Sequence, residues 1–326
     1  MLVRRGVLFI FALLVIVIII IPTVLVRGCN LTTIPQQSSE QEEIRVKLYD
    51  IKTNQLYDLG LEEYIKGVVA AEMPAEFELE ALKAQAVAAR TYASKRIKSL
   101  GGTGSSKYPE ADLCSDPAVD QAWISKTEMK QKWGVLGYYT YYAKISKAVE
   151  ETRGEVIVYN GELIDPVYHS TCGGATENSE DVWSTAVPYL RSVTCNYDQH
   201  SNRYSETLEF SLAEVSKKTN TDLTAITVAT NGGKLIQNLE VSPTGRVKTL
   251  KLADKIFKGT DFRFALGLRS TRFTAEIKNN KLVITTKGYG HGVGMCQYGA
   301  DGMAKLGKNY KEILTYYYTG VQLKKL

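Results

Sequence analysis

A long uncharged segment near the N-terminus restricts what this chain can fold into. Residues 6–26 contain no charged side chain and are dominated by Val, Ile, Leu and Phe. A helix of this length spans a bilayer core of about 30 Å. Arg4 and Arg5 precede the segment, which favours a cytoplasmic N-terminus. We therefore expect a cytoplasmic tail at 1–5, a transmembrane anchor at 6–26 and an extracytoplasmic remainder.

A cleaved signal peptide is the alternative interpretation of this segment. Its apolar region would usually be shorter, and no clean small-x-small cleavage site follows here. The sequence Val26-Arg27-Gly28-Cys29 only faintly resembles a lipoprotein cleavage site, because Arg27 is a poor fit. An uncleaved anchor is the favoured prediction.

The charge balance argues against a nucleic-acid-binding surface. The formal net charge is +5, from 40 basic and 35 acidic residues. Arg4, Arg5 and Arg27 are the basic residues before Gly28, and no acidic residue precedes it, so residues 28–326 carry only +2. A surplus this small does not indicate a phosphate-binding face.

The rest of the chain mixes helical and strand patterns and predicts an α+β fold. Residues 27–43 are rich in polar side chains and are expected to form a flexible stalk, followed by a folded domain at 44–326. A separate group of elements at about 210–267 is interpreted as an inserted subdomain. Expected elements are a strand at 44–49, helices at 62–71, 78–97, 212–218, 300–306 and 310–318, strands at 226–229, 235–241 and 247–252, and hairpins centred on Asn160-Gly161 and Asn279-Asn280.

Glu72 stands where a helical run stops before Pro74. A carboxyl group at such a bend can project into a cleft, and apolar neighbours such as Val68, Val69 and Met73 can raise its pKa. A carboxylic acid with a raised pKa is suited to general acid catalysis. The alternative is a carboxylate that caps a turn or pairs with a nearby Arg.

Two cysteines and two of the three histidines in the chain lie close together in sequence. They form the pairs His169–Cys172 and Cys195–His200. Zinc prefers thiolate and imidazole ligands in a tetrahedral set, so these four residues are candidate zinc ligands. A Cys172–Cys195 disulfide and two unrelated loops are the alternatives.

A glycine-rich block at 288–300 is the other concentration of unusual residues. It contains five glycines between Gly288 and Gly299 and includes His291, Cys296 and Gln297. Glycines allow the backbone to approach a ligand closely, although a purely structural turn is equally compatible. The block lacks the context of a dinucleotide fingerprint and the lysine of a phosphate loop.

Five motifs in order resemble the stage II sporulation protein D family. They are Val69-Ala-Ala-Glu-Met-Pro74, Glu80-Ala-Leu-Lys-Ala-Gln-Ala-Val-Ala-Ala-Arg-Thr-Tyr-Ala93, Tyr168-His-Ser-Thr-Cys-Gly-Gly174, Pro188-Tyr-Leu-Arg-Ser-Val193 and Gly290-His-Gly-Val-Gly-Met-Cys-Gln-Tyr-Gly-Ala300. The resemblance runs through most of the expected extracytoplasmic domain. It implies an α+β fold with a long substrate groove.

The resemblance also implies a lytic transglycosylase of peptidoglycan. Such enzymes cut the MurNAc–GlcNAc bond of peptide-stripped glycan without water, leaving 1,6-anhydro-MurNAc ends. The catalytic acid of the family maps onto Glu72. Arg90 is expected to fold back beside it and, together with Tyr189, Arg191, His291 and Gln297, to bind substrate. The family often has Lys where this chain has Arg191.

The expected partners and alternatives follow from the same resemblance. Stage II sporulation protein P, an amidase, strips the stem peptides, and stage II sporulation protein M recruits both proteins to the septum between mother cell and forespore during engulfment. Zinc is not needed for the chemistry, and ligands at these cysteines would belong to one branch of the family. A zinc-dependent wall hydrolase and a non-enzymatic glycan-binding amidase enhancer are the alternative functions.

Overall fold

The computed structural model describes residues 17–18, 43–223 and 235–326. Within these ranges, no helix has both the length and the apolar composition needed to cross a membrane. The predicted anchor at 6–26 lies outside the described residues except for positions 17 and 18. The expected strand at 226–229 and the stalk up to residue 42 also lie outside them.

Helices and strands are mixed in the described residues, as predicted, with eight α-helices and several small sheets. The helices are α3 (Leu61–Glu72), α4 (Leu79–Ser94), α5 (Lys126–Glu151), α6 (Glu180–Trp183), α7 (Leu212–Thr219), α8 (Gly259–Leu266), α9 (Gln297–Lys305) and α10 (Tyr310–Tyr317). A short 3₁₀ helix, η2, spans Lys98–Leu100.

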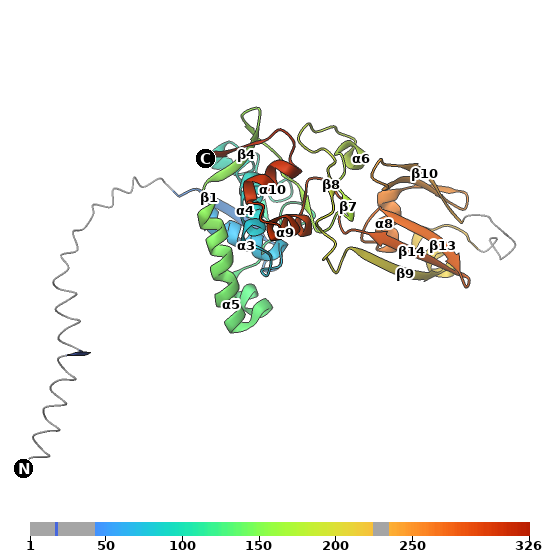
Figure 1. The fold of residues 1–326 in the computed structure, drawn as a ribbon, viewed down its shortest axis with the longest axis horizontal. Helices are drawn as coiled ribbons and strands as arrows, with labels where there is room; N and C mark the ends of the chain where they lie inside the picture. The colour runs from blue at the N-terminus through green and yellow to red at the C-terminus, as the bar shows by residue number, and fades with distance from the viewer. Residues whose placement is uncertain (1–16, 19–42, 224–234) are drawn as a thin grey trace, which may run out of the picture. The chain divides into compact units, whose positions relative to one another are not determined.

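The first hydrophobic core is built around α4, which contacts α3, α5, α9 and α10 (Figure 1). Leu82, Ala86, Ala89 and Ala93 recur at spacings of three and four along α4 and are fully buried. Small side chains at helical spacing let the neighbouring helices approach closely. This packing holds the end of α3 in place.

Two three-stranded sheets border this core. One has the order β2-β1-β3, and the other has the order β16-β4-β5. Asn160 and Gly161 have positive φ values of 51° and 89° between β4 and β5, which confirms the predicted hairpin. The strands are β1 (Arg45–Asp50), β2 (Gln55–Gly60), β3 (Leu113–Cys114), β4 (Glu155–Tyr159), β5 (Glu162–Leu163) and β16 (Gln322–Lys325).

Short strands join segments that are distant in the sequence. β6 (Tyr168–His169) pairs in parallel with β15 (Met295–Cys296), so the glycine-rich block lies against the motif that contains His169. β7 (Gly174–Ala175) pairs with β8 (Thr194–Cys195) in antiparallel fashion. These pairings bring the residues of the fourth and fifth motifs near the third.

A second hydrophobic core covers the predicted inserted subdomain and extends past its boundary at residue 267, because Phe273, Leu282 and Ile284 belong to it. The hairpin at Asn279-Asn280 is confirmed, with φ values of 47° and 60°. Two sheets contribute, in the orders β10-β11-β12 and β13-β14-β9. The strands are β9 (Ser205–Ser211), β10 (Ile236–Val241), β11 (Val247–Leu252), β12 (Lys255–Lys258), β13 (Phe273–Lys278) and β14 (Lys281–Lys287).

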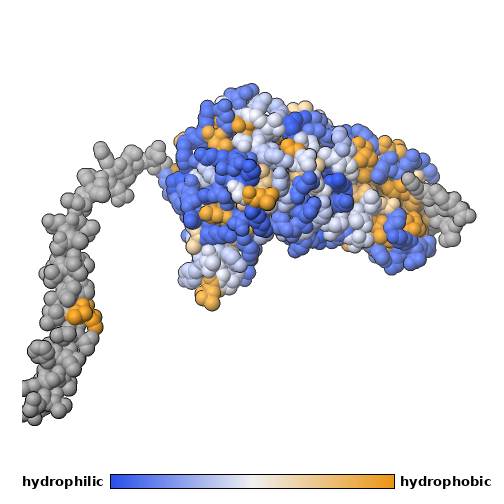
Figure 2. Space-filling model, in the orientation of Figure 1, coloured by the Kyte–Doolittle hydropathy of each residue, from blue (hydrophilic) through white to orange (hydrophobic). Residues whose placement is uncertain are grey.

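Helix α5 was not predicted. Ser125 and Glu128 form a capping box at its start, a signal that the sequence contains. Gly134 interrupts the helix with a φ of 68°, and the adjacent Val135 and Leu136 are exposed. The visible surface is largely hydrophilic with small apolar patches, one of them at the free end of α5 (Figure 2).

Arg90 is a structural residue of the first core, contrary to the prediction that it lies beside Glu72. Its guanidinium is fully buried and donates to both carboxylate oxygens of Glu62, at 2.9 and 2.6 Å. It also donates to the carbonyl oxygens of Val149 and Glu155. The bend after α3 is followed by an antiparallel α4, and the long Arg90 side chain reaches the start of α3 instead of its end.

Replacing Arg90 by Met should lower the free energy of unfolding by about 3–5 kcal/mol, because Glu62 is then buried without its cation. Urea-induced unfolding of the purified chain measures this. Lys308→Ala is the control, because it removes an exposed ion pair with Glu312 and should cost less than about 1 kcal/mol. Equal effects of the two substitutions would contradict the structural role of Arg90.

Candidate active site

Glu72 is the last residue of α3, where Met73 leaves the helical conformation ahead of Pro74. A backbone hydrogen bond from Met73 N to Val69 O closes the last turn. Glu72 Oε1 accepts a hydrogen bond from Ala122 N at 3.2 Å, and Oε2 accepts one from Gln297 Nε2 at 3.4 Å. The predicted helix break therefore presents this carboxyl group to segments far away in the sequence.

The surroundings of Glu72 favour its protonated form. Burial raises the pKa of the Glu72 carboxyl above its ordinary value, and the hydrogen bonds from Ala122 and Gln297 offset only part of this effect. Among the described residues, Glu72 makes no salt bridge. The negative end of the α3 dipole also disfavours a carboxylate at this position. This arrangement is the one expected of a general acid.

Glu72 lines a cavity of about 750 Å³. Two further pockets, of about 520 and 510 Å³, share residues with it: Arg203 and Tyr289 line the first, and Trp183 and His291 line the second. The three hollows therefore share walls at these side chains. The chemically notable residues that line the central cavity are Glu72, Asp120, His169, Trp183, His291 and Gln297.

His291 and Gln297, both predicted to bind substrate, line this cavity. His291 Nδ1 accepts a hydrogen bond from Val293 N, so its Nε2 carries the proton donated to Tyr168 O at 3.0 Å. Burial, and to a lesser extent the nearby charge of Arg246, lower the pKa of His291 to about 4. A neutral ring with both nitrogens occupied shapes the cavity wall and is poorly suited to act as a base.

Tyr189 and Arg191 do not line this cavity, in contrast to the prediction. Tyr189 Oη accepts a hydrogen bond from Asp165 N at 3.0 Å. Arg191 forms a bidentate pair with Glu180 at 2.7 and 2.5 Å. Glu180 begins α6, whose last residue is Trp183, so Arg191 stabilises the segment that carries a cavity residue. Its effect on the site is therefore indirect.

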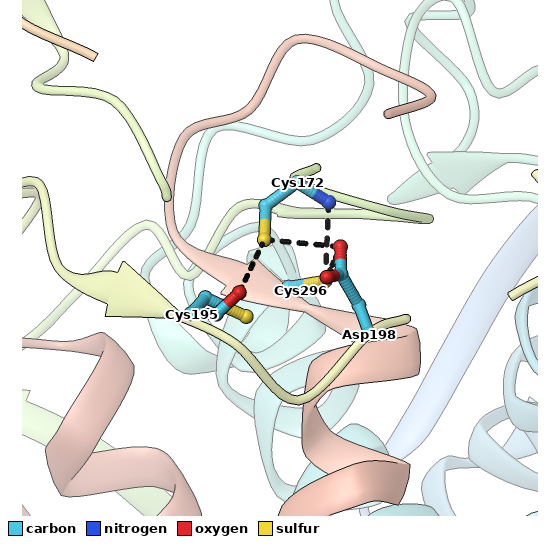
Figure 3. Close-up of side chains that lie close together, drawn as sticks. All are labelled: Cys172, Cys195, Asp198 and Cys296. Carbon is cyan, nitrogen blue, oxygen red and sulfur yellow. Dashed lines mark hydrogen bonds between the residues drawn. The ribbon is translucent and has the colours of Figure 1, made fainter. Parts of the chain in front are cut away.

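The four predicted zinc ligands do not come together. His169 Nδ1 donates to Val293 O, and His200 Nε2 lies 2.9 Å from Asp301 Oδ2. Cys172 and Cys195 instead lie with Asp198 and Cys296, and the ligand atoms of these four are within 4.8 Å of one another (Figure 3). Cys172 and Cys195 are free thiols, so the alternative of a disulfide between them is not observed.

The comparisons with known proteins agree with the motifs. A family model described as "Stage II sporulation protein" matches residues 49–159. Stage II sporulation protein D of Bacillus subtilis (strain 168) is 39% identical over 280 residues, which cover 86% of this chain and 79% of the relative. The protein of the same name from Bacillus amyloliquefaciens is 34% identical over 339 residues, covering 98% and 96%. The chain belongs to the stage II sporulation protein D family.

Another relative of this family member has a different name. A Bacillus subtilis (strain 168) protein named "Amidase enhancer" is 32% identical over 310 residues. The match covers 79% of this chain and 40% of that protein. The family name associates this chain with sporulation, and the name of this relative associates that relative with an amidase.

Several residues of this stage II sporulation protein D family member were missed by sequence reasoning. Trp183, one of three tryptophans, packs its ring 5.0 Å from that of His291. Asp120 lines the cavity from a loop that has no recognisable pattern. Asp198 follows Cys195 by three residues, and Cys296 lies inside the glycine-rich block. Both residues therefore lie near motifs that the sequence makes conspicuous, but nothing in the sequence indicates that they approach each other in space.

Glu72→Gln should make the protein more stable than the parent at pH 7, with a difference that shrinks as the pH falls toward 4.5. The pKa of Glu72 is raised above 4.5 in the folded state, so its stabilising contribution is complete below 4.5 and is lost as the pH rises. Glutamine is neutral throughout. Urea unfolding at a series of pH values measures the difference.

Glu180→Gln provides a control of opposite sign for this experiment. The pKa of Glu180 is lowered to about 2, mainly by its hydrogen bond with Arg191. This variant should be less stable than the parent at pH 7, and the deficit should fade as the pH falls toward 2. A pH-independent difference for Glu72→Gln would contradict the raised pKa.

Proposed function

We propose that this protein is a lytic transglycosylase that cleaves the MurNAc–GlcNAc bond of peptide-stripped glycan strands during forespore engulfment. The observation that carries the proposal is a half-buried carboxyl group, Glu72, that lines the central cavity without a salt bridge among the described residues. The resemblance of the motif around Glu72 to the catalytic motif of the family supports the same assignment.

A single carboxyl group is sufficient for this reaction. Protonated Glu72 donates its proton to the glycosidic oxygen as the bond from that oxygen to the anomeric carbon breaks. The resulting carboxylate then accepts the proton of the sugar's own 6-hydroxyl, whose oxygen forms the new bond to the anomeric carbon. Glu72 ends protonated again, no water is consumed, and the product is a 1,6-anhydro sugar. A raised pKa supplies the acid form at the start of the cycle.

Gln297 is suited to position Glu72. Its amide donates to Glu72 Oε2 at 3.4 Å and to Gln85 Oε1 at 3.3 Å. Gln85 is fully buried in α4, so the amide of Gln297 is held by the first core. A neutral donor orients the carboxyl group while leaving its pKa raised, which an arginine at this position would not do.

Asp120 is the other acidic residue that lines the central cavity, but its oxygens already have several donors. Oδ1 accepts from Tyr92 Oη, and Oδ2 accepts from Ser105 Oγ and Cys114 N. The Asp120 carboxylate also lies 3.7 Å from the guanidinium of Arg96, and the Asp120 side chain is 3% exposed. These contacts give Asp120 a structural role, so a mechanism with two carboxylates is disfavoured relative to one with a single acid.

Aromatic rings along the cavity support a carbohydrate ligand. Trp183 is 45% exposed and Tyr289 is 36% exposed, and both line the cavity that contains Glu72. The guanidinium of Arg203 lies 5.0 Å from the ring of Tyr289. Exposed amphipathic rings offer apolar faces to sugar rings while remaining stable in water.

The relative named "Amidase enhancer" favours one second candidate, a glycan-binding protein that assists an amidase without cleaving glycan. For the enzyme, we propose that the amidase stage II sporulation protein P prepares its substrate and that stage II sporulation protein M recruits both. We also propose a single-pass membrane location with the catalytic domain outside the cytoplasm, based on the uncharged segment at 6–26.

Incubation of the purified full chain with denuded glycan, followed by mass analysis, tests the proposed reaction. The parent should release anhydro products, each lighter by one water than a hydrolytic product. Glu72→Gln should lower the rate by about 10²–10⁴-fold, because it keeps the shape of the side chain and removes the transferable proton. Glu76→Gln, at an exposed position just after the bend, is the matched control.

Three outcomes would overturn the proposal. Products that contain added water would identify a hydrolase. Full activity of Glu72→Gln would remove Glu72 from the chemistry. Glycan binding by the parent without any product would favour the amidase-enhancer role instead.

Gln297→Leu should shift the pH dependence of glycan cleavage. The amide of Gln297 lowers the pKa of Glu72, so its removal raises that pKa further. Cleavage requires protonated Glu72 in the first step, and the alkaline limb of the kcat/KM profile should move to higher pH. Gln121→Leu is the control, since Gln121 lines the same cavity but donates to Tyr168 Oη, and its limb should not move.

A further inference from the structure

Three cysteines and one aspartate from separate segments meet in the interior of the protein. Cys172 follows β6, Cys195 ends β8, Asp198 lies just after it, and Cys296 ends β15. All four residues are fully buried. Their side chains point toward one another (Figure 3), with Asp198 Oδ2 at 3.1 Å from Cys172 Sγ and 3.7 Å from Cys296 Sγ.

We propose that Cys172, Cys195, Asp198 and Cys296 form a closed, tetrahedral zinc site. Thiolates and carboxylates are established zinc ligands, and a structural site takes four of them. With Zn–S bonds of about 2.3 Å, tetrahedral geometry separates two sulfur ligands by about 3.8 Å. The four ligand atoms lie within 4.8 Å of one another, so small side-chain rotations suffice to bind the ion.

An unpaired oxygen is independent evidence for a missing ligand. Asp198 is completely buried, and its Oδ1 atom has no hydrogen-bond partner among the described residues. A buried carboxylate oxygen without a partner is costly unless a cation satisfies it. A cation bound by the Asp198 carboxylate would remove this cost.

Backbone N–H groups and a tyrosine hydroxyl surround the cysteine sulfurs, and such hydrogen-bond donors stabilise thiolates. Cys296 Sγ accepts from Cys172 N at 3.3 Å and from Gly299 N at 3.2 Å. Cys296 is also the N-cap of α9, where the helix dipole favours negative charge. The hydroxyl of Tyr317 lies 3.1 Å from Cys195 Sγ. Such outer contacts orient and tune metal ligands.

Two guanidinium groups lie beside this ligand set, and one of them, Arg246, is also paired with Glu177 at 3.4 Å. Three thiolates and a carboxylate around Zn²⁺ carry a net charge of −2. Arg246 donates to Cys172 O at 3.3 Å, and Arg272 donates to Gly173 O at 2.6 Å. Arg246 is 3% exposed, so its charge is poorly screened by water.

The site is structural, because its ligands are buried and supply a full tetrahedral set. The backbone of Gly299 packs closely against the cluster, since a Cβ atom at position 299 would lie 2.7 Å from Cys195 Sγ. Zinc would tie β6, β8 and β15 together. Cys296 immediately precedes Gln297, so the ion would hold the amide that contacts Glu72. This inference does not depend on the proposed glycan chemistry.

Metal analysis of the full chain, purified with detergent and a reductant that does not chelate metals, tests the site. We expect about one zinc ion per chain, as for a four-ligand site. After exchange of zinc for Co²⁺, the charge-transfer absorption should correspond to three thiolates. Because this spectrum is recorded on the parent chain, the test does not depend on whether ligand variants fold.

Single substitutions identify the ligands. Cys296→Ser and Asp198→Asn should lose most of the bound zinc during a wash with a weak chelator. Cys114→Ser is the matched control, because Cys114 is a buried free thiol outside the cluster and its loss should leave the zinc content unchanged. His169→Asn and His200→Asn should also retain zinc, as should Glu72→Gln.

A metal-free chain in which all five cysteines titrate as thiols, or one with a disulfide within the cluster, would overturn the proposal. Loss of zinc in His200→Asn but not in Cys296→Ser would instead support the ligand set predicted from sequence spacing. Failure of glycan cleavage together with retained zinc would refute only the proposed function, so the two proposals fail separately.

Discussion

The site depends on the parallel pairing of β6 with β15. This short ladder joins Tyr168 and His169 to Met295 and Cys296, segments more than a hundred residues apart in sequence. Parallel pairing needs a long connection, and here the connection contains the whole second core. Because Gln297 follows β15 directly, the pairing places its amide against Glu72 at the end of α3.

Two glutamates of one helix have opposite electrostatic surroundings. Glu62, in the first turn of α3, lies at the positive end of the helix dipole and accepts two hydrogen bonds from the Arg90 guanidinium. Glu72, at the negative end, receives only a backbone amide and a glutamine amide. Glu62 is therefore a carboxylate held in the core by an ion pair, whereas Glu72 is a carboxyl group that is available as an acid.

Local sequence signals predicted many of the elements, but α5, α8 and several short strands were missed. The turn residues Asn160-Gly161 and Asn279-Asn280 defined both hairpins, because positive φ values restrict which residues can occupy such turns. Pro74 marked the end of α3 within one residue. The site was harder to predict, since Arg90 and the zinc ligands were assigned from spacing along the chain. Spacing does not say which way α4 returns or which cysteine a distant strand brings near.

Short sequence patterns and local backbone preferences were enough to predict the family, the helix break at Glu72 and the positions of the turns. The tertiary structure alone decided which side chains meet. Burial of the α4 face against α3 and α5 directed Arg90 to Glu62, and strand pairing brought Cys296 to Cys172 and Cys195. Such contacts arise from long-range packing, which no local pattern encodes.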